Sequence, residues 1–272
     1  MKVLIAGSAG QLGRALQATA PANVTVIAPP EVDFDICDPE AVARVVAAAA
    51  PALVINAAAY TAVDKAETEA AIAQRVNVNA VGLLASAARN AGAGFVHVST
   101  DFIFDGTAHL PYPPDALPNP LGVYGRTKLE GEEAARDLHG NPLIVRTAWV
   151  YAAKGANFVA TMLRLMRERS ELGVVADQIG TPTHVPTLAR TIWTLAQGGH
   201  TGTFHATDAG VASWYDFAVA IHEEALALGL LTTPVTVKPI RTSDYPTPAQ
   251  RPAYSVLDKS ATWALTGLPN HW

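Results

Sequence analysis

Short, continuous apolar runs alternate with stretches of helical composition over the first 150 residues of the chain. Apolar runs that predict strands occupy residues 2–7, 23–28, 52–59, 92–100 and 142–151. Stretches of helical composition lie between them, at residues 11–20, 38–51, 66–90 and from 122 onward. Strands of a parallel sheet are buried on both faces and are therefore apolar along their length. The alternation predicts an α/β protein with a doubly wound parallel sheet and right-handed crossovers.

The segment 38–51 carries its own helix start signal. Asp38 suits the N-cap, Pro39 suits the first helical position, and Glu40 favours the positive end of the helix dipole. The sequence therefore predicts a helix that begins at Pro39.

The alternation loosens after Tyr151. The later chain mixes helical segments with proline-rich loops, the former at 158–169 and 214–227 and the latter at 181–186 and 245–252. We therefore expect a first domain at residues 1–150 and a smaller substrate-binding lobe made mainly of residues 151–272. A further helix and strand at about 186–207 are expected to return to the main sheet, so that the lobe is discontinuous in sequence.

Composition narrows the class of protein. Of the 272 residues, 50% are hydrophobic and 16% are charged, and the net charge is −5 without a basic run. These values argue against nucleic acid or an anionic membrane surface as a partner. The single cysteine, Cys37, excludes an intramolecular disulfide and a Cys-rich metal site. No signal-peptide pattern and no apolar run of about 20 residues is present, so we expect a cytoplasmic protein that does not span a membrane.

The stretch GSAGQLG places Gly7, Gly10 and Gly13 between the first predicted strand and the first predicted helix. Glycine lets the backbone turn sharply and approach a ligand closely. A helix N-terminus offers free N–H groups and a positive dipole end to a pyrophosphate. The spacing is one residue longer than the usual dinucleotide fingerprint, but its place at the first strand-to-helix turn is where such ligands bind. The pattern predicts a dinucleotide-binding domain at residues 1–150; the alternative is a glycine-rich turn without a ligand.

The end of the second predicted strand does not identify the dinucleotide. Acidic residues follow it at positions 31, 33 and 35, and no Arg or Lys stands there to receive a 2′-phosphate. Arg14, just after the third glycine, is the nearest basic candidate. The sequence therefore leaves NADH and NADPH as equal alternatives.

Tyr124 and Lys128 are four residues apart in the stretch GVYGRTKLEGE. In a helix this spacing puts both side chains on one face. A free tyrosine has a pKa of ~10, and a neighbouring cation lowers it by favouring the phenolate. The pair is a candidate acid/base device; the alternative is two solvated residues that share a helix face.

Two further strand ends carry candidate chemistry. VSTDFIFDG ends a predicted strand in Ser99, Thr100 and Asp101, whose oxygens could bind a reacting carbonyl. NAAAYTAVDKAE follows another strand with small residues at 57–59, which would let a cofactor lie against the strand end. The alternatives are ordinary turn-forming residues and the high alanine content of this chain.

These motifs together resemble the extended short-chain dehydrogenase/reductase family, and in detail they are similar to the dTDP-4-dehydrorhamnose reductases. The similar segments are NAAAYTAVDKAE, STDFIFDG, VYGRTKLEGE, RTAWVYAAKGANF, DQIGTPT and YPTPAQRP. They follow one another in the expected order over nearly the whole chain.

The resemblance implies a Rossmann-type fold and reduction of the 4-keto group of dTDP-4-dehydro-β-L-rhamnose to dTDP-β-L-rhamnose, with NADPH or NADH as hydride donor. It assigns catalytic roles to Tyr124, Lys128 and Thr100, and substrate contacts to Thr100, Asp101 and Trp149. The cofactor contacts that it implies are Gly7, Gly10, Gln11, Leu12, Gly13, Asp35, Ile36, Ala59, Tyr60, Thr61, Tyr124 and Lys128. For Trp149, the alternative is a core aromatic residue.

The chain departs from the family pattern at three places. Phe102 stands where the family usually has tyrosine, so one hydroxyl donor to the substrate is missing. Ala15 stands where some members place an acidic Mg²⁺ ligand at a subunit contact, so we expect no metal and a monomer or weak homodimer. The sequence stops at LPNHW, where relatives usually carry a further helix.

Two other functions compete with this interpretation. One is reduction of another nucleotide-4-keto-6-deoxysugar, which the sequence does not distinguish. The other is a non-catalytic, regulatory dinucleotide-binding subunit. The presence of Tyr124, Lys128 and Thr100 argues against a purely regulatory role.

Overall fold

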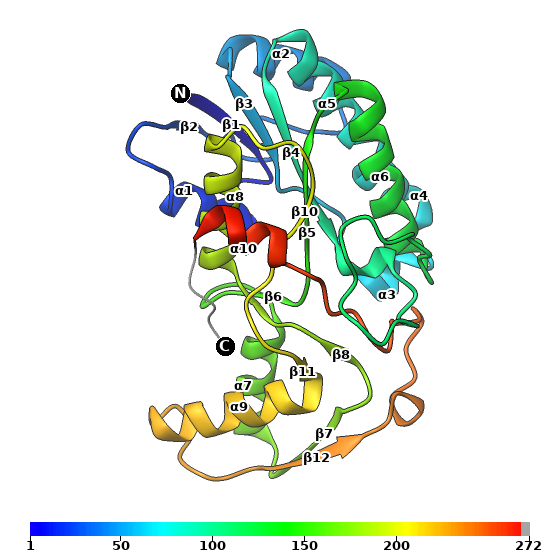
Figure 1. Ribbon diagram of the computed structural model, residues 1–272. Helices are drawn as coiled ribbons and strands as arrows, with labels where there is room; N and C mark the ends of the chain where they lie inside the picture. The colour runs from blue at the N-terminus through cyan, green and yellow to red at the C-terminus, as the bar shows by residue number, and fades with distance from the viewer. Residues whose placement is uncertain (268–272) are drawn as a thin grey trace.

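The computed structural model describes residues 1–267, and its centre is a parallel sheet (Figure 1). Six strands pair in the order β2–β1–β3–β4–β5–β10, all of them parallel. Their bounds are β1 Lys2–Ala6, β2 Thr25–Ile27, β3 Leu53–Asn56, β4 Gly94–Thr100, β5 Leu143–Thr147 and β10 Gly202–His205. The predicted doubly wound sheet is confirmed. The order reverses between β1 and β3, so the switch point lies beside the glycine-rich turn.

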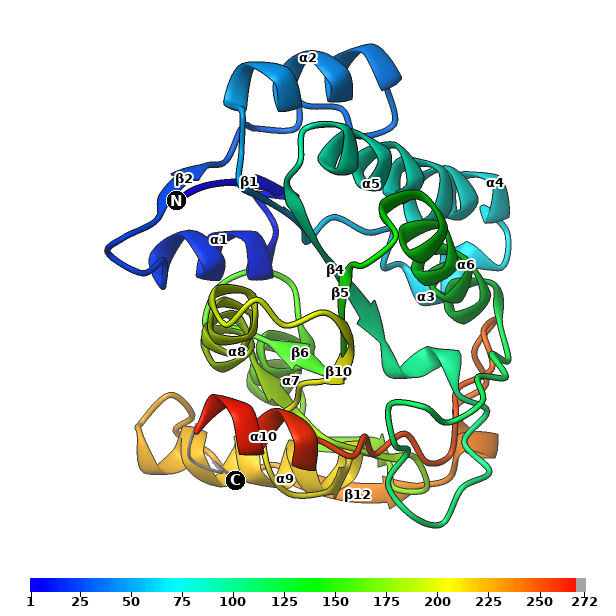
Figure 2. The same ribbon diagram turned by 45° about the horizontal axis from the view of Figure 1, so that its top comes forward.

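Helices cover both faces of this sheet (Figure 2). One face carries α1 (Gln11–Ala18) and α8 (Val185–Gln197), and the other carries α2 (Pro39–Ala49), α5 (Ala80–Asn90) and α6 (Val123–His139). Successive side chains of a strand point to opposite faces. In β1, Val3 and Ile5 therefore pack with α1 and α8, whereas Leu4 and Ala6 pack toward α2 and α5.

The helix predicted at 38–51 begins as expected. Its first residue is Pro39, and the Asp38 side chain accepts a hydrogen bond from the Glu40 backbone N–H at 2.9 Å. It ends at Ala49, because Ala50 adopts a left-handed conformation with φ +41°.

The single helix predicted at 66–90 is instead interrupted. It consists of α3 (Val63–Ala66), α4 (Ala70–Gln74), a π-helical turn η1 (Arg75–Asn79) and α5. The wide turn places Asn77 so that its side chain accepts from the Tyr60 N–H at 2.8 Å and donates to the Thr127 hydroxyl at 3.2 Å. These polar contacts to two other segments compete with a regular helix, and π-turns of this kind are frequent at functional sites.

The C-terminal part packs below the sheet as a smaller lobe (Figure 1). It contains α7 (Phe158–Glu168), β7 (Glu171–Val175), α9 (Trp214–Ala227) and β12 (Thr236–Ile240), with an apolar cluster of its own. Its shorter elements are β6 (Val150–Tyr151), β8 (Ile179–Gly180), β9 (Thr183–His184), β11 (Ala212–Ser213) and η3 (Thr242–Asp244). Strand β10 pairs with β5, α8 covers the main sheet, and α10 (Ser260–Thr266) lies beside them. The domain boundary near residue 150 stays a prediction.

A buried ion pair ties α6 to β5. Arg146 donates to Glu132 through Nε at 2.8 Å and through Nη2 at 2.8 Å, and both residues are almost fully buried. Two glycines of α6 also let its backbone lie close to the segments that contain Phe102 and Asn77. A Cβ at Gly125 would stand 2.1 Å from the Phe102 carbonyl oxygen, and one at Gly131 would stand 2.1 Å from that of Asn77. The helix that carries the Tyr–Lys pair is therefore fixed against the sheet.

Among residues 1–267, no helix combines the length and apolar composition that a membrane crossing needs.

Glu132→Gln should destabilise the protein by about 3–5 kcal/mol, because it leaves the buried Arg146 guanidinium without its counter-charge. Urea unfolding measures the change. The matched control is Arg164→Met, which breaks the exposed Arg164–Glu168 pair on α7 and should cost no more than about 0.5 kcal/mol. Equal losses in the two variants would contradict the role given to the buried pair.

Candidate active site

A cavity of about 390 Å³ opens at the carboxyl ends of β3, β4 and β5, beside the N-terminus of α1. Of the residues singled out in the sequence, it brings together Gly10, Gln11, Leu12, Ala59, Thr61, Thr100, Asp101, Tyr124, Lys128 and Trp149. A second cavity of about 770 Å³ contains Gly7, Asp35 and Ile36 and shares Gly10 and the 57–59 segment with the first. The two cavities form one groove, which runs across the switch point of the sheet.

The glycine turn allows α1 to start close to β3. Gly7 has φ +76°, and a Cβ there would stand 2.6 Å from the Ala58 nitrogen. A Cβ at Gly13 would stand 2.1 Å from the Gly7 carbonyl oxygen. Gly10 lines both cavities, whereas Gly13 is buried and lines neither. Gly13 therefore packs against the glycine turn, and the cofactor contact expected there stays a prediction.

Tyr60 also lies outside both cavities, unlike its neighbours Ala59 and Thr61. Its hydroxyl donates to the Glu69 carboxylate, and this hydrogen bond is the main reason that its pKa is raised to about 12. Its backbone is held by the Asn77 side chain. Tyr60 therefore shapes the loop and presents its neighbours to the groove.

Thr100 and Asp101 stand where β4 ends. The Thr100 hydroxyl donates to Asp101 Oδ1 at 3.0 Å and accepts from the Phe102 N–H at 3.2 Å. Asp101 is only 2% exposed, and burial raises its pKa to about 6 despite hydrogen bonding from Ser255 and Thr100. A carboxyl group that is partly protonated near neutral pH can donate as well as accept a hydrogen bond.

Tyr124 lies in the first turn of α6, where the Val123 N–H donates to Glu67 Oε1 at 2.8 Å. Burial raises the pKa of Tyr124 to about 12; Asp101 adds to the increase and Thr100 opposes it. The Phe102 ring packs edge-on against the phenol at a centroid distance of 5.4 Å. The tyrosine is therefore fully protonated at neutral pH.

Lys128 lies one turn further along α6 and lines the same cavity. Burial lowers its pKa to about 8, and its Nζ donates to the Val98 carbonyl oxygen at 2.7 Å. Lys128 is not among the groups that shift the pKa of Tyr124. The expectation that Lys128 lowers the pKa of Tyr124 is therefore wrong, because the Lys128 Nζ donates to Val98 and burial raises the pKa of the phenol.

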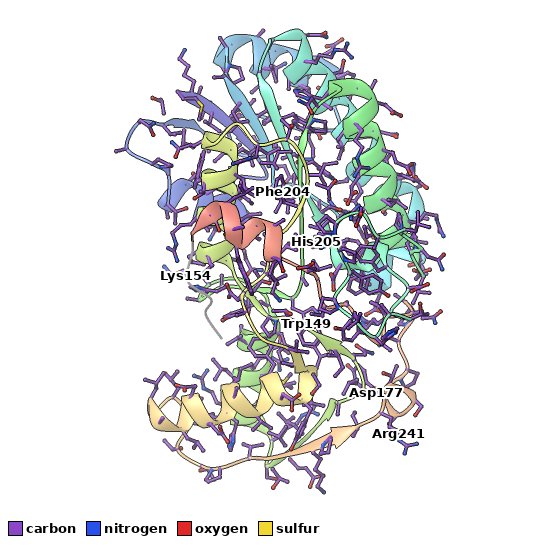
Figure 3. The ribbon with its side chains drawn as sticks, viewed as in Figure 1. Trp149, Lys154, Asp177, Phe204, His205 and Arg241 are labelled. Carbon is purple, nitrogen blue, oxygen red and sulfur yellow. The ribbon has the colours of Figure 1, made fainter. Side chains whose placement is uncertain are left out.

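Trp149 joins the groove to the C-terminal lobe (Figure 3). Its ring stacks on Trp214 of α9 at a centroid distance of 3.5 Å, and a Cβ at Gly180 would stand 2.5 Å from it. Its φ of +46° is rare for a bulky residue, and residues with such strained backbone cluster at functional sites. Trp149 is half-buried and lines the cavity, which favours a ligand wall over a core aromatic.

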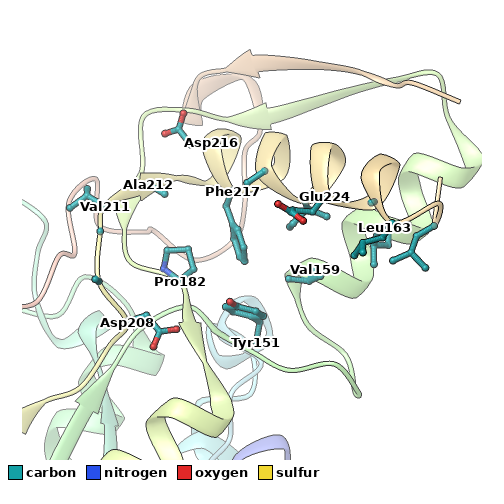
Figure 4. A pocket seen from close by; sticks show the side chains of 17 residues that line it. Tyr151, Val159, Leu163, Pro182, Asp208, Val211, Ala212, Asp216, Phe217 and Glu224 are labelled. Atoms are coloured by element: carbon teal, nitrogen blue, oxygen red, sulfur yellow. The ribbon is translucent and has the colours of Figure 1, made fainter. Parts of the chain in front are cut away.

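Another cavity, of about 620 Å³, lies in the C-terminal lobe between α7 and α9 (Figure 4). Its walls are mainly apolar and include Tyr151, Pro182 and Phe217. Its acidic Asp216 already caps α9 through Ser213. None of the candidate catalytic residues lines this cavity, so the groove above the sheet is the better active-site candidate.

Three residues of interest in and beside the groove were not singled out in the sequence. Arg75 lines the Asp35 end, although the two are far apart in the chain and only the fold brings them together. Thr147 ends β5 with a buried hydroxyl that has no hydrogen-bond partner among the described residues. His97 is fully buried behind Lys128. Thr147 could have been predicted, because it is a hydroxyl residue near the carboxyl end of a predicted strand. No local sequence pattern points to Arg75 or His97.

Nowhere in residues 1–267 do three or more His, Cys, Asp or Glu side chains gather in a way that could hold a metal ion.

A parallel sheet with a glycine turn at its switch point, and a tyrosine and lysine in the same groove, defines an oxidoreductase of the short-chain dehydrogenase/reductase class. The family model described as "RmlD substrate binding domain" matches residues 1–272. The chain belongs to this family of dTDP-4-dehydrorhamnose reductases.

Individual relatives agree with this assignment. A dTDP-4-dehydrorhamnose reductase of Burkholderia thailandensis is 44% identical over 96% of this chain and 91% of its own. A crystal structure of the Bacillus anthracis dTDP-4-dehydrorhamnose reductase in complex with NADP superposes with a TM-score of 0.93. It is 36% identical and covers 99% of this chain and 94% of its own. The spore coat polysaccharide biosynthesis protein SpsK of Bacillus subtilis is 39% identical over 100% of this chain and 94% of its own.

Asp101→Asn should stabilise the protein at pH 7.5 by about 1–3 kcal/mol, because it removes a carboxylate whose ionisation is disfavoured by burial. The pKa of the carboxyl is about 6 in the folded state and near 3.8 otherwise. The penalty is therefore absent below the unfolded pKa, grows as the pH rises between the two values and is complete above the folded pKa. Urea unfolding at pH 5 and 7.5 should show a gain that is smaller at pH 5 by about 1 kcal/mol. A gain that does not depend on pH would contradict this explanation.

Proposed function

We propose that this protein reduces the 4-keto group of dTDP-4-dehydro-β-L-rhamnose to dTDP-β-L-rhamnose with NADPH or NADH. The observation that carries the proposal is the meeting of Tyr124, Lys128 and Thr100 in a cavity that continues into the glycine turn. Membership of the reductase family and the likeness to an NADP-bound relative support it.

The groove fits a dinucleotide along its length. The pyrophosphate would lie over Gly7 and Gly10, where the first turn of α1 offers N–H groups and a positive dipole end. Asp35 and Ile36 would hold the adenosine end, and Ala59, Thr61, Gln11 and Leu12 the nicotinamide end. The bound cofactor supplies the hydride, and the protein positions the sugar and polarises its carbonyl group.

Tyr124 is the proton donor. Its raised pKa keeps the phenol protonated at neutral pH, so a proton is available for the carbonyl oxygen as the hydride adds to C4. Thr100 lies beside the phenol, and its hydroxyl would turn from Asp101 Oδ1 to donate to the same oxygen. Once the phenol has given up its proton, the ammonium of Lys128 is the cation in this cavity that balances the phenolate.

Asp101 and Trp149 are the substrate-binding residues in this proposal. Asp101 lies at the floor of the cavity beside Thr100, and Trp149 forms the wall toward the C-terminal lobe. The sugar would therefore lie between the sheet and α9. A cytoplasmic location and a monomeric or weakly dimeric state remain expectations from the sequence.

Reduction of another nucleotide-4-keto-6-deoxysugar is the second candidate. The phenyl ring of Phe102 in the cavity favours it, because a hydroxyl donor to the sugar is missing there. NADPH oxidation with enzymatically made dTDP-4-dehydro-L-rhamnose, measured beside other 4-keto-6-deoxysugar nucleotides, separates the two. Cofactor binding without turnover on any of them would indicate the regulatory alternative instead.

Tyr124→Phe should lower kcat by ~10²–10⁴ and leave cofactor binding intact, because it removes only the hydroxyl of the proton donor. Lys128→Met should lower kcat and also weaken cofactor binding, since a charged hydrogen-bond donor is lost. Tyr245→Phe, an exposed position outside the groove, is the control and should change neither. Near-wild-type kcat in a folded Tyr124→Phe protein would rule out this mechanism.

Arg75→Met should weaken the binding of NADPH by roughly 10–100-fold and leave NADH unaffected, because a guanidinium at the adenosine end can pair with the 2′-phosphate. Arg14→Met is the matched control, since Arg14 lines neither cavity. Calorimetric titration with NADPH and NADH gives both affinities without turnover. An equal loss for both cofactors, or a selective loss in Arg14→Met, would show that Arg75 does not read the phosphate.

A further inference from the structure

His97 is a fully buried residue of β4 that lies between Asn56 and Lys128. Its Nδ1 is 3.2 Å from Asn56 Nδ2, and its Nε2 is 3.5 Å from Lys128 Nζ. The family resemblance assigns no role to this histidine.

The surroundings fix the tautomer of the His97 ring. Asn56 Oδ1 accepts the Ala58 N–H at 3.1 Å, so the Asn56 amide presents its NH₂ group to the ring. A donor at this position requires an unprotonated Nδ1. Burial, followed by the charges of Lys128 and Arg136, holds the pKa of His97 well below its usual value, so the ring is neutral. The single ring proton therefore resides on Nε2 and faces Lys128.

An N–H that faces Lys128 distinguishes the two forms of the amine. The ammonium has only donors, one of which goes to the Val98 carbonyl oxygen at 2.7 Å. The ammonium and the His97 Nε2–H therefore face each other as two donors, and no hydrogen bond forms between them. The neutral amine keeps the bond to Val98 and has a lone pair that can accept from His97. The neutral amine can therefore form a hydrogen bond with His97, whereas the ammonium cannot.

We propose that His97 is a positioning residue for Lys128: its fixed Nε2–H favours the neutral amine over the ammonium, so that Lys128 can release a proton as well as supply a charge. The low pKa of Lys128, set first by burial, agrees with this role.

Other charges around Lys128 act in the opposite direction or are already paired. The carboxylate of Glu132 raises the pKa of Lys128, but it is bonded to Arg146 and Arg136. Tyr124 and Asp101 line the same cavity. His97 carries no charge, so it acts on the Lys128 amine through the position of its Nε2 hydrogen.

The catalytic consequence rests on the proposed function. When Tyr124 has given its proton to the carbonyl oxygen, the phenolate takes a proton from the Lys128 ammonium: the N–H bond breaks as the phenol O–H forms, which restores the phenol and leaves a neutral amine. The neutral amine then accepts from His97. Lys128 takes up a new proton from solvent once the product has left the groove. His97 therefore stabilises the state in which Tyr124 is protonated again and Lys128 is a neutral amine.

The tautomer is measured directly by NMR of the imidazole ring nitrogens in histidine-labelled protein. The expected result is a neutral ring protonated at Nε2 that does not titrate between pH 6 and 9. A ring protonated at Nδ1, or an imidazolium, would overturn the proposal. The measurement needs no turnover, so its failure is distinct from failure of the proposed function.

Two variants test the effect on Lys128. His97→Leu removes the N–H and should raise the pKa of Lys128 by about half to one unit, from the worth of one hydrogen bond. His97→Gln, whose amide nitrogen can stand near the position of Nε2, should restore most of the wild-type value. Titration of the labelled lysine side chain by NMR gives the pKa, and the alkaline limb of the kcat profile should move with it. A merely structural role predicts lower stability in His97→Leu with an unchanged Lys128 pKa, and that result would refute the proposal.

Discussion

The buried ion pair between Glu132 and Arg146 holds the structure of the site together. It clamps α6 onto β5, and two glycines of the same helix let its backbone reach the neighbouring segments. Tyr124 and Lys128 are fixed at the carboxyl ends of β4 and β5 only because this helix lies so close. A buried pair of this kind is costly to break, although it adds little net stability over apolar packing. We interpret it as a device for placement rather than for stability.

Burial also determines the chemistry of the groove. Each of three titratable residues is moved toward its neutral form: the pKa of Asp101 rises to about 6, that of Tyr124 rises to about 12, and that of Lys128 falls to about 8. Such shifts cost folding free energy and cluster at functional sites. A reaction that adds a hydride to a carbonyl needs a proton donor at neutral pH, and a desolvated phenol meets that need. The shift at Lys128 makes the nearby cation responsive to its surroundings, including the histidine behind it.

Much of this arrangement could be predicted from the sequence. The glycine turn at Gly7 and Gly10, the helix start at Pro39 and the shared helix face of Tyr124 and Lys128 are local features, since each depends on residues within a turn or two. The apolar runs likewise predicted the doubly wound sheet, because parallel strands are buried on both faces.

The remainder depends on tertiary packing that local patterns do not encode. The burial of Lys128 and its bond to the Val98 carbonyl, which leave the pKa of Tyr124 high, arise from the distance between α6 and β4. The packing role of Gly13 follows from the approach of α1 to the glycine turn. Arg75 begins the π-turn that interrupts the predicted helix, and it lines the Asp35 end of the groove. In each case a long-range contact overrides the local signal.

Every role assigned to the groove depends on the passage of a hydride from the bound cofactor to C4 of the sugar. Incubation of the protein with NADPH deuterated at the nicotinamide C4 and dTDP-4-dehydro-L-rhamnose, followed by mass spectrometry and NMR of the sugar nucleotide, traces this hydride. We expect one deuterium, at C4 of the product sugar, from one face of the nicotinamide only. Recovery of unreduced sugar with the labelled cofactor unchanged, from a folded protein that binds both, would contradict this expectation.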